Sequence, residues 1–175
     1  MKFEFFESLS RAEAEKYLQN FLEVEGKAFE GLAAEAAADG LLLNFTLPSL
    51  APLYEWVAKR AAVVSKEPDP ALPPWIRNTE SYAEGLFDLT PETSAAVMRT
   101  AYYLGETFRR RFPSLHWGIG DPSTAEQQQP VVGPFQHGIE MPVILVTENL
   151  VRAMIKGKGR EIAERAFARW ASSVN

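Results

Sequence analysis

Cysteine is absent from this 175-residue chain, and histidine occurs only twice. Without cysteine the protein has no disulfide, no thiolate metal site and no cysteine nucleophile. Such a composition suits a reducing compartment, so we expect a cytoplasmic protein. Only His116 and His137 remain as imidazole candidates for acid–base chemistry or metal binding.

Long apolar runs are also missing. The longest, such as Val143–Val146, fall far short of the ~20 residues that a membrane-spanning helix requires. Near the N-terminus, Glu4 and Glu7 interrupt the aromatic cluster, and no apolar core of about 7–15 residues follows. We therefore expect neither a signal peptide nor a membrane span.

The chain also has no excess of basic residues. The chain carries 18 lysine and arginine residues against 23 aspartate and glutamate residues, a formal net charge of −5. Proteins that bind nucleic acids usually show a basic excess, because neutralising phosphates supplies much of their affinity. The charge balance therefore argues against a nucleic-acid partner and favours, weakly, a basic one.

The amino-acid composition is typical of a folded protein. Hydrophobic residues make up 46% of the chain and aromatic residues 11%, which is typical of globular proteins. The length fits one domain of about 100–200 residues, and we find no internal repeat. We therefore predict a single domain over residues 1–175.

Hydrophobic residues recur at helical spacing in five stretches. Ser10 and Glu13 have the spacing of a capping box at the start of the first helix, and Gly157 follows the fourth as a stop signal. The predicted helices cover about residues 11–38, 50–64, 90–112, 148–156 and 160–172. Before them, Lys2–Phe6 is predicted to form a short strand or an aromatic arm.

The connection between the second and third helices is rich in proline. Ser65–Pro74 contains four prolines, each of which fixes φ and removes a backbone donor. We expect a stiff, irregular loop that wraps the surface. Trp75 is expected to pack against the protein as its anchor.

Three short stretches rich in Val, Ile, Trp and Phe follow the third helix, at about residues 115–120, 130–135 and 140–146. Glycines, prolines and a run of glutamines, Gln127–Gln129, separate them, so a small antiparallel sheet of two or three strands is predicted. The fold class is then α+β, with long N-terminal helices packed on this sheet and two helices at the C-terminus.

The most distinctive stretch lies on the third helix. Gly105 lacks a side chain, so a ring such as that of Trp117 can lie against the helix there. Glu106 beside it has two interpretations. As an unpartnered buried acid it would have a raised pKa and could serve as a general acid. We favour a structural role, either an ion pair with Arg109 or Arg110, one helical turn further on, or a hydrogen bond to the strand backbone.

The two histidines fall on neighbouring predicted strands. Together with Glu140 or Asp121 they could form a site of two histidines and one carboxylate, which suits a metal. No motif with diagnostic metal-ligand spacing occurs, so we expect two unrelated histidines. We accordingly predict no metal, no cofactor and no catalytic residues.

Other chemical motifs are missing or incomplete. The chain contains no G-x-S-x-G nucleophile elbow, and Gly118–Gly120 lacks the third glycine of a dinucleotide site. Gly157–Arg160 lies at a helix junction, where glycine-rich loops can bind anions. We interpret it as a tight turn between helices.

Several short motifs occur in order along the chain: Leu50–Trp56 (L-x-x-L-Y-E-W), Tyr102–Glu106 (Y-Y-L-G-E), His116–Gly118 (H-W-G), Gln129–Val132 (Q-P-V-V) and then Pro142. Over about residues 41–157 this pattern resembles a group of small bacterial domains of unknown function. Some stand-alone α+β domains of this kind resemble immunity proteins of bacterial toxin systems. The resemblance implies a bacterial protein and brings no established catalytic residue with it.

These observations favour a non-enzymatic protein-interaction module, such as an immunity protein that binds and blocks a basic toxin. Its acidic contact surface could draw on Glu35, Asp39, Asp69, Glu80, Glu84 and Asp88. The alternative is a metal-binding or small-molecule-binding enzyme with a cleft between the third helix and the sheet. That cleft would be lined by Glu106, His116, Trp117 and His137. An oligomerising subunit, the third possibility, would show a large exposed apolar patch.

Overall fold

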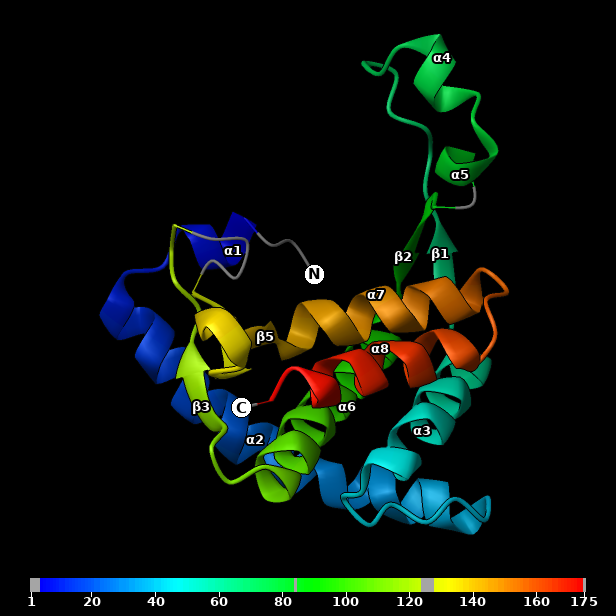
Figure 1. Cartoon of the computed structure of the whole chain (residues 1–175). Coiled ribbons are helices and arrows are strands. Elements are labelled where there is room, and N and C mark those ends of the chain that lie inside the picture. The colour runs from blue at the N-terminus through cyan, green and yellow to red at the C-terminus, as the bar shows by residue number, and fades with distance from the viewer. Residues whose placement is uncertain (1–3, 84, 124–127, 175) are drawn as a thin grey trace.

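The computed structural model describes residues 4–83, 85–123 and 128–174, so Phe3, Glu84 and Gln127 lie outside the described residues. The chain has an α+β fold (Figure 1). Its helical body consists of α2 (Arg11–Ala38), α3 (Leu47–Arg60), α6 (Pro91–Arg111), α7 (Val143–Ile155) and α8 (Glu161–Ser172). Within the part of the chain described, no helix combines the length and apolar character needed to cross a bilayer.

Helix α2 begins and ends as its sequence predicts. The Ser10 hydroxyl accepts a hydrogen bond from the Glu13 backbone N–H, and the Glu13 carboxylate accepts one from the Ser10 backbone N–H at 2.7 Å. This reciprocal capping box satisfies two N–H groups that the helix leaves free. At the other end, Gly40 adopts a left-handed φ of 79° directly after the C-cap Asp39.

Of the segment Lys2–Phe6, the described residues 4–6 are helical, so the first of its two alternatives, a short strand, is wrong there. Lys2 lies outside the described residues together with Phe3. Helix α1 covers Glu4–Glu7. Phe6 is fully buried in the core, where its ring meets that of Tyr17 edge-on with centroids 5.1 Å apart. Burial of this aromatic side chain ties the short helix to α2.

Helix α3 begins and ends earlier than predicted. Thr46 is its N-cap and Pro48 lies in the first turn, so Pro52 falls inside the helix. The predicted apolar stripe is present, since Leu50, Leu53, Tyr54 and Val57 are buried. Residues 61–64, expected to continue the helix, instead turn into an extended segment, because β-branched Val63 and Val64 pair as a strand.

That strand belongs to a segment that we call the arm, residues 63–89. Strand β1 (Val63–Ser65) pairs antiparallel with β2 (Phe87–Leu89), with Val63 opposite Leu89 and Ser65 opposite Phe87. Between the strands lie the short helices α4 (Pro74–Arg77) and α5 (Glu80–Ala83). In Figure 1 the arm projects away from the helical body, with α4 at its far end. The expectation of a loop wrapped over the surface is therefore wrong.

The predicted antiparallel sheet is confirmed. Strands β3 (His116–Ile119), β4 (Pro130–Gly133) and β5 (Met141–Pro142) form a sheet in the order β3-β4-β5. The ends of two stretches differ from prediction, because β4 stops at Gly133 and Val143–Val146 forms the first turn of α7 instead of a strand. An apolar run this short fits a buried strand or a buried helix equally well.

The turn predicted at Gly157–Arg160 is also confirmed. Gly157 takes a left-handed φ of 84° after the C-cap of α7. The Glu161 carboxylate lies directly over Gly159, since a Cβ added there would come 2.1 Å from its Oε2. The protein's own carboxylate therefore lies at the start of α8, the position at which an anion-binding loop would hold its anion.

The core is built where α3, α6 and α7 meet. Tyr54, Leu104 and Ile144, one from each helix, are fully buried. The Tyr54 hydroxyl hydrogen-bonds the Thr147 hydroxyl at 2.7 Å, which satisfies both polar groups inside the core. The sheet and the root of the arm contact these helices.

Candidate functional site

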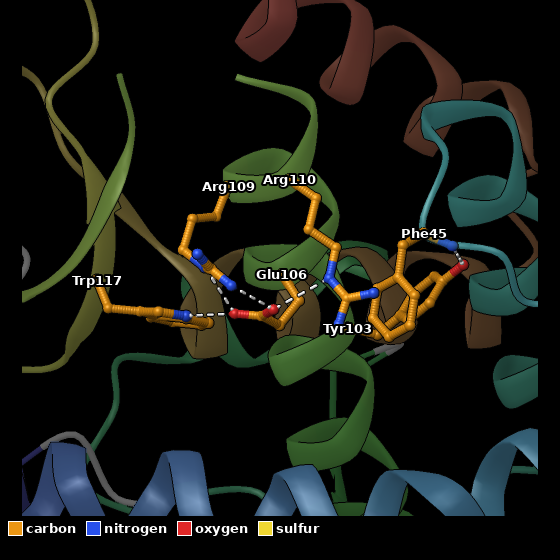
Figure 2. Close-up of polar contacts among 6 residues, drawn as sticks. All are labelled: Phe45, Tyr103, Glu106, Arg109, Arg110 and Trp117. Carbon is orange, nitrogen blue, oxygen red and sulfur yellow. Dashed lines mark hydrogen bonds and ion pairs between the residues drawn. The ribbon is translucent and has the colours of Figure 1, made fainter. Parts of the chain in front are cut away.

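Glu106 lies at the centre of a polar cluster between α6 and the sheet (Figure 2). Arg109 holds the carboxylate with two hydrogen bonds of 2.9 Å, from its Nε and Nη2. Trp117 Nε1 donates to Oε1 at 2.8 Å, and Arg110 Nε donates to Oε2 at 3.2 Å. The Glu106 residue is only 5% exposed, so these donors replace the water that the carboxylate loses.

This pairing determines the charge of the Glu106 carboxyl. Burial raises its pKa, but the hydrogen bonds from Arg109, Trp117 and Arg110 together outweigh burial and leave the pKa below its ordinary value. A general acid must carry a proton near neutral pH, and this group does not. The predicted ion pair with Arg109 and Arg110 is confirmed.

The ring of Trp117 lies directly against α6 at Gly105, as predicted. A Cβ added to Gly105 would come 2.1 Å from the indole Cη2, so no larger residue fits without displacement. The indole also meets the ring of Phe21 from α2 edge-on, with centroids 5.8 Å apart. Trp117 therefore fills the space between α6 and the sheet in which the alternative function, an enzyme, would need its cleft.

The histidines do not join this cluster. His116 precedes Trp117 in β3, so the two side chains point to opposite faces of the sheet. His137 lies in a short 3-10 turn, Gln136–Gly138, with a left-handed φ of 61°, and both histidines are exposed. Across residues 4–83, 85–123 and 128–174, no three His, Asp or Glu side chains are grouped to hold a metal. The metal alternative with Glu140 or Asp121 is therefore not found.

The arm exposes apolar side chains to solvent. Trp75 in α4 is 74% exposed, so its predicted role as a packed anchor is wrong. Val63 and Val64 of β1 are exposed as well. Trp75 lies at the far end of the arm and the two valines at its root, so they do not form one patch, and Trp75 is the large ring that the far end presents to solvent.

The arm is also acidic and internally ordered. Its sequence contains five carboxylates against Lys66 and Arg77. The Asp69 carboxylate accepts a hydrogen bond from the Ala71 N–H at 2.8 Å, and the Tyr82 hydroxyl accepts one from the Asp69 N–H at 2.9 Å. These bonds connect Asp69 to Ala71 and to Tyr82 within the segment between the strands.

The root of the arm is fastened to the body by polar contacts. The Ala62 N–H donates to Thr93 Oγ1 at 2.9 Å, and that hydroxyl donates to the Ala62 carbonyl at 3.0 Å. On the other strand, Arg152 Nη1 of α7 donates to the Phe87 carbonyl at 3.0 Å, and its guanidinium lies 5.1 Å from the centre of the Phe87 ring. The projection is therefore anchored at both strands.

The acidic residues singled out in the sequence do not form one cluster. Asp69, Glu80 and Asp88 belong to the arm, and Glu35 is exposed on α2. Asp39 is engaged elsewhere, because it accepts hydrogen bonds from Trp56 Nε1 and from Arg60. Sequence reasoning missed the arm as a unit, although its Val-Val pair and proline-rich interior were visible.

Comparison of the chain with models of known protein families, with curated proteins and with solved structures finds no match. The resemblance to small bacterial domains and to immunity proteins therefore rests on the short motifs alone. What the protein does must be argued from its own geometry.

Proposed function

We propose that the protein is a non-enzymatic protein-interaction module that contacts its partner through the arm. The observation that carries this proposal is the exposure of Trp75 in α4, at the far end of the projecting segment (Figure 1). Tryptophan is enriched among the residues that dominate binding energy in protein interfaces. A large apolar ring held away from the body is available to enter a hollow on another protein.

The charge of the arm indicates the chemistry of that partner. Glu67, Asp69 and Asp88 accompany Trp75 on the same projection. An acidic contact element attracts a basic surface and speeds the encounter with it. The partner we propose has a basic surface with an apolar hollow, which fits the basic toxin expected from the resemblance to immunity proteins.

The cleft enzyme receives less support. Glu106 is held by three donors with a lowered pKa, and Trp117 is packed on Gly105. His116 points to the other face of the sheet. These side chains stabilise the junction of α6 with the sheet, a role that requires no substrate.

The test is a pull-down with the purified protein as bait in extract of its native cells, read by mass spectrometry. Trp75→Ala removes the exposed ring, and Leu42→Ala is the matched control, since Leu42 is 73% exposed on the body. We expect one stoichiometric basic partner, retained by the wild type and by Leu42→Ala. Trp75→Ala should weaken its binding by at least about tenfold, as hot-spot truncation does.

Direct titration of the recovered partner against the three baits then gives the dissociation constants. Equal affinity of the Trp75→Ala and wild-type proteins would contradict the assignment of the contact to the arm. Failure to recover any stoichiometric partner would contradict the proposed function itself.

A further inference from the structure

The arm joins the body through two short connections that lie side by side. Helix α3 ends at Arg60, and β1 begins three residues later at Val63. Strand β2 ends at Leu89, and α6 begins at Pro91. Because Val63 and Leu89 are register partners, both connections leave the body at one point. A two-stranded ribbon has little stability of its own, so these connections form a hinge, and a contact away from the hinge has to set the angle of the arm.

The hinge itself is held by Thr93, near the start of α6. The Thr93 hydroxyl accepts a hydrogen bond from the Ala62 N–H at 2.9 Å and donates one to the Ala62 carbonyl at 3.0 Å. The Thr90 N–H also donates to that carbonyl, at 3.2 Å. These bonds lie where the arm leaves the body, so they fix the position of the hinge and leave the angle to another contact.

Arg152 of α7 contacts the arm beyond the hinge, on the side where α7 lies beside the root of the arm (Figure 1). Its Nη1 donates to the Phe87 carbonyl at 3.0 Å, and its guanidinium lies 5.1 Å from the centre of the Phe87 ring. Phe87 comes two residues before Leu89 in β2, so this contact lies about 7 Å along the strand from the hinge. A contact at that distance restricts the angle at which the arm projects.

The guanidinium of Arg152 is itself held in place. Its Nε donates to Glu148 Oε1 at 2.8 Å, one turn earlier in α7. The Arg152 side chain is only 23% exposed and that of Glu148 only 7%. Because a guanidinium is planar and presents its donors in a fixed geometry, the bond to Glu148 also determines where Nη1 points. Helix α7 thereby determines the position of the β2 backbone at Phe87.

We propose that Arg152 is a positioning residue for recognition, which fixes the angle of the arm and so presents Trp75 to the partner in one orientation. This inference rests on the proposed function, in which Trp75 makes the contact. A contact element that already has its binding orientation loses less conformational freedom on binding, so the complex is tighter. If only a fraction of the molecules has that orientation, the apparent dissociation constant rises in inverse proportion to the fraction.

The angle of the arm is measured as a distance between two spin labels, by double electron–electron resonance. The chain has no cysteine, so Ala71→Cys in the arm and Arg165→Cys on α8, both at exposed positions, place one label in each part. We expect a single narrow distance distribution for the labelled protein that retains Arg152.

Arg152→Lys, introduced into the labelled protein, should broaden this distribution. Lysine retains a cation for Glu148 but lacks the second donor of the fork, which reaches the Phe87 carbonyl. The matched control is Arg11→Lys, since the pair of Arg11 with Glu15 is exposed and lies far from the arm in the sequence. It should leave the distribution unchanged.

The same proteins are then titrated with the partner recovered in the pull-down. The dissociation constant of Arg152→Lys should exceed that of the parent protein by the inverse of the fraction that keeps the parent distance. Arg152→Gln, which removes the charge as well, should follow the same relation. A purely structural role would lower the midpoint of thermal unfolding without linking affinity to the distance distribution.

An unchanged distance distribution in both Arg152 variants would overturn the proposal. So would a broadened distribution combined with unchanged affinity, because the angle of the arm would then not matter for binding. Recovery of no partner overturns the proposed function instead, and the distance distributions then decide separately whether Arg152 fixes the arm.

Discussion

The contact between Gly105 and Trp117 leaves no room for a methyl group, so Gly105 and Gly31, each inside a long helix, should respond oppositely to alanine. Gly31 in α2 has no atom within 4 Å of an added Cβ, and Gly31→Ala should raise the free energy of unfolding by up to about 1 kcal/mol. Gly105→Ala should lower it by about 1–3 kcal/mol, because the indole must move. Urea denaturation of both variants measures the difference. Equal effects at the two positions would contradict the packing described here.

Glu106 should make stability depend on pH in a defined direction. Its pKa is lower in the folded protein than in the unfolded chain, so its contribution is complete above the ordinary glutamate pKa. That contribution is lost as the pH falls through the lowered folded value. Glu106→Gln should therefore reduce the free energy of unfolding by about 1–3 kcal/mol near neutral pH, and by progressively less in acid.

Urea denaturation at a series of pH values tests this prediction. Glu164→Gln is the control, since the pair of Glu164 with Arg160 is exposed and should contribute little. A Glu106→Gln deficit that stays constant into acid would show that the charge of the carboxylate is not responsible.

At the scale of single residues, the sequence predicted those contacts that helical spacing controls. Arg109 and Arg110 follow Glu106 by three and four residues, so their pairing needs no knowledge of the fold. The exposure of Trp75 could not be predicted in this way. Trp75 is exposed because the pairing of β1 with β2 brings the two ends of the arm together and leaves the segment between them away from the body. That pairing joins residues that are distant in the sequence.

At the scale of elements, the predictions for two valine-rich runs were both wrong, and in opposite directions. Val63 and Val64, expected at the end of a helix, form a strand, whereas Val143–Val146, expected in a strand, begins α7. Neither run is long enough for its periodicity to identify it. The first is fixed by a partner more than twenty residues away, and the second by burial of Val143 and Ile144 in the core.

The elements with local start and stop signals were predicted well. The capping box at Ser10 and the left-handed Gly157 each rest on a few adjacent residues. The arm had no such signal, since its strands β1 and β2 pair across more than twenty residues of sequence. Candidate sites built from distant elements are therefore the part that sequence reasoning misses.

At the scale of the whole molecule, the body should fold without the arm. Lys66 and Leu86 continue the register of Ser65 and Phe87, and the Lys66 N–H donates to the Leu86 carbonyl at 2.9 Å. Replacing residues 67–85 with Asn-Gly therefore closes the ribbon by a two-residue hairpin turn. We expect the midpoint of thermal unfolding to change by less than about 5 °C, because the buried core lies in the body. Circular dichroism measures this change.

The shortened protein should also lose its partner in the pull-down. A molten or unfolded product would show that the arm is part of the cooperative core rather than a projection from it.

Because Val63 and Leu89 lie opposite each other, the chain leaves the body and returns to it at the same point. A segment inserted between such neighbouring positions can be exchanged for another without stretching any connection in the helices beneath. Under the proposed function, recognition and folding then depend on separate stretches of sequence. A gene encoding this body could acquire a new binding preference by replacing one short internal segment, while the residues that stabilise the fold remain unchanged.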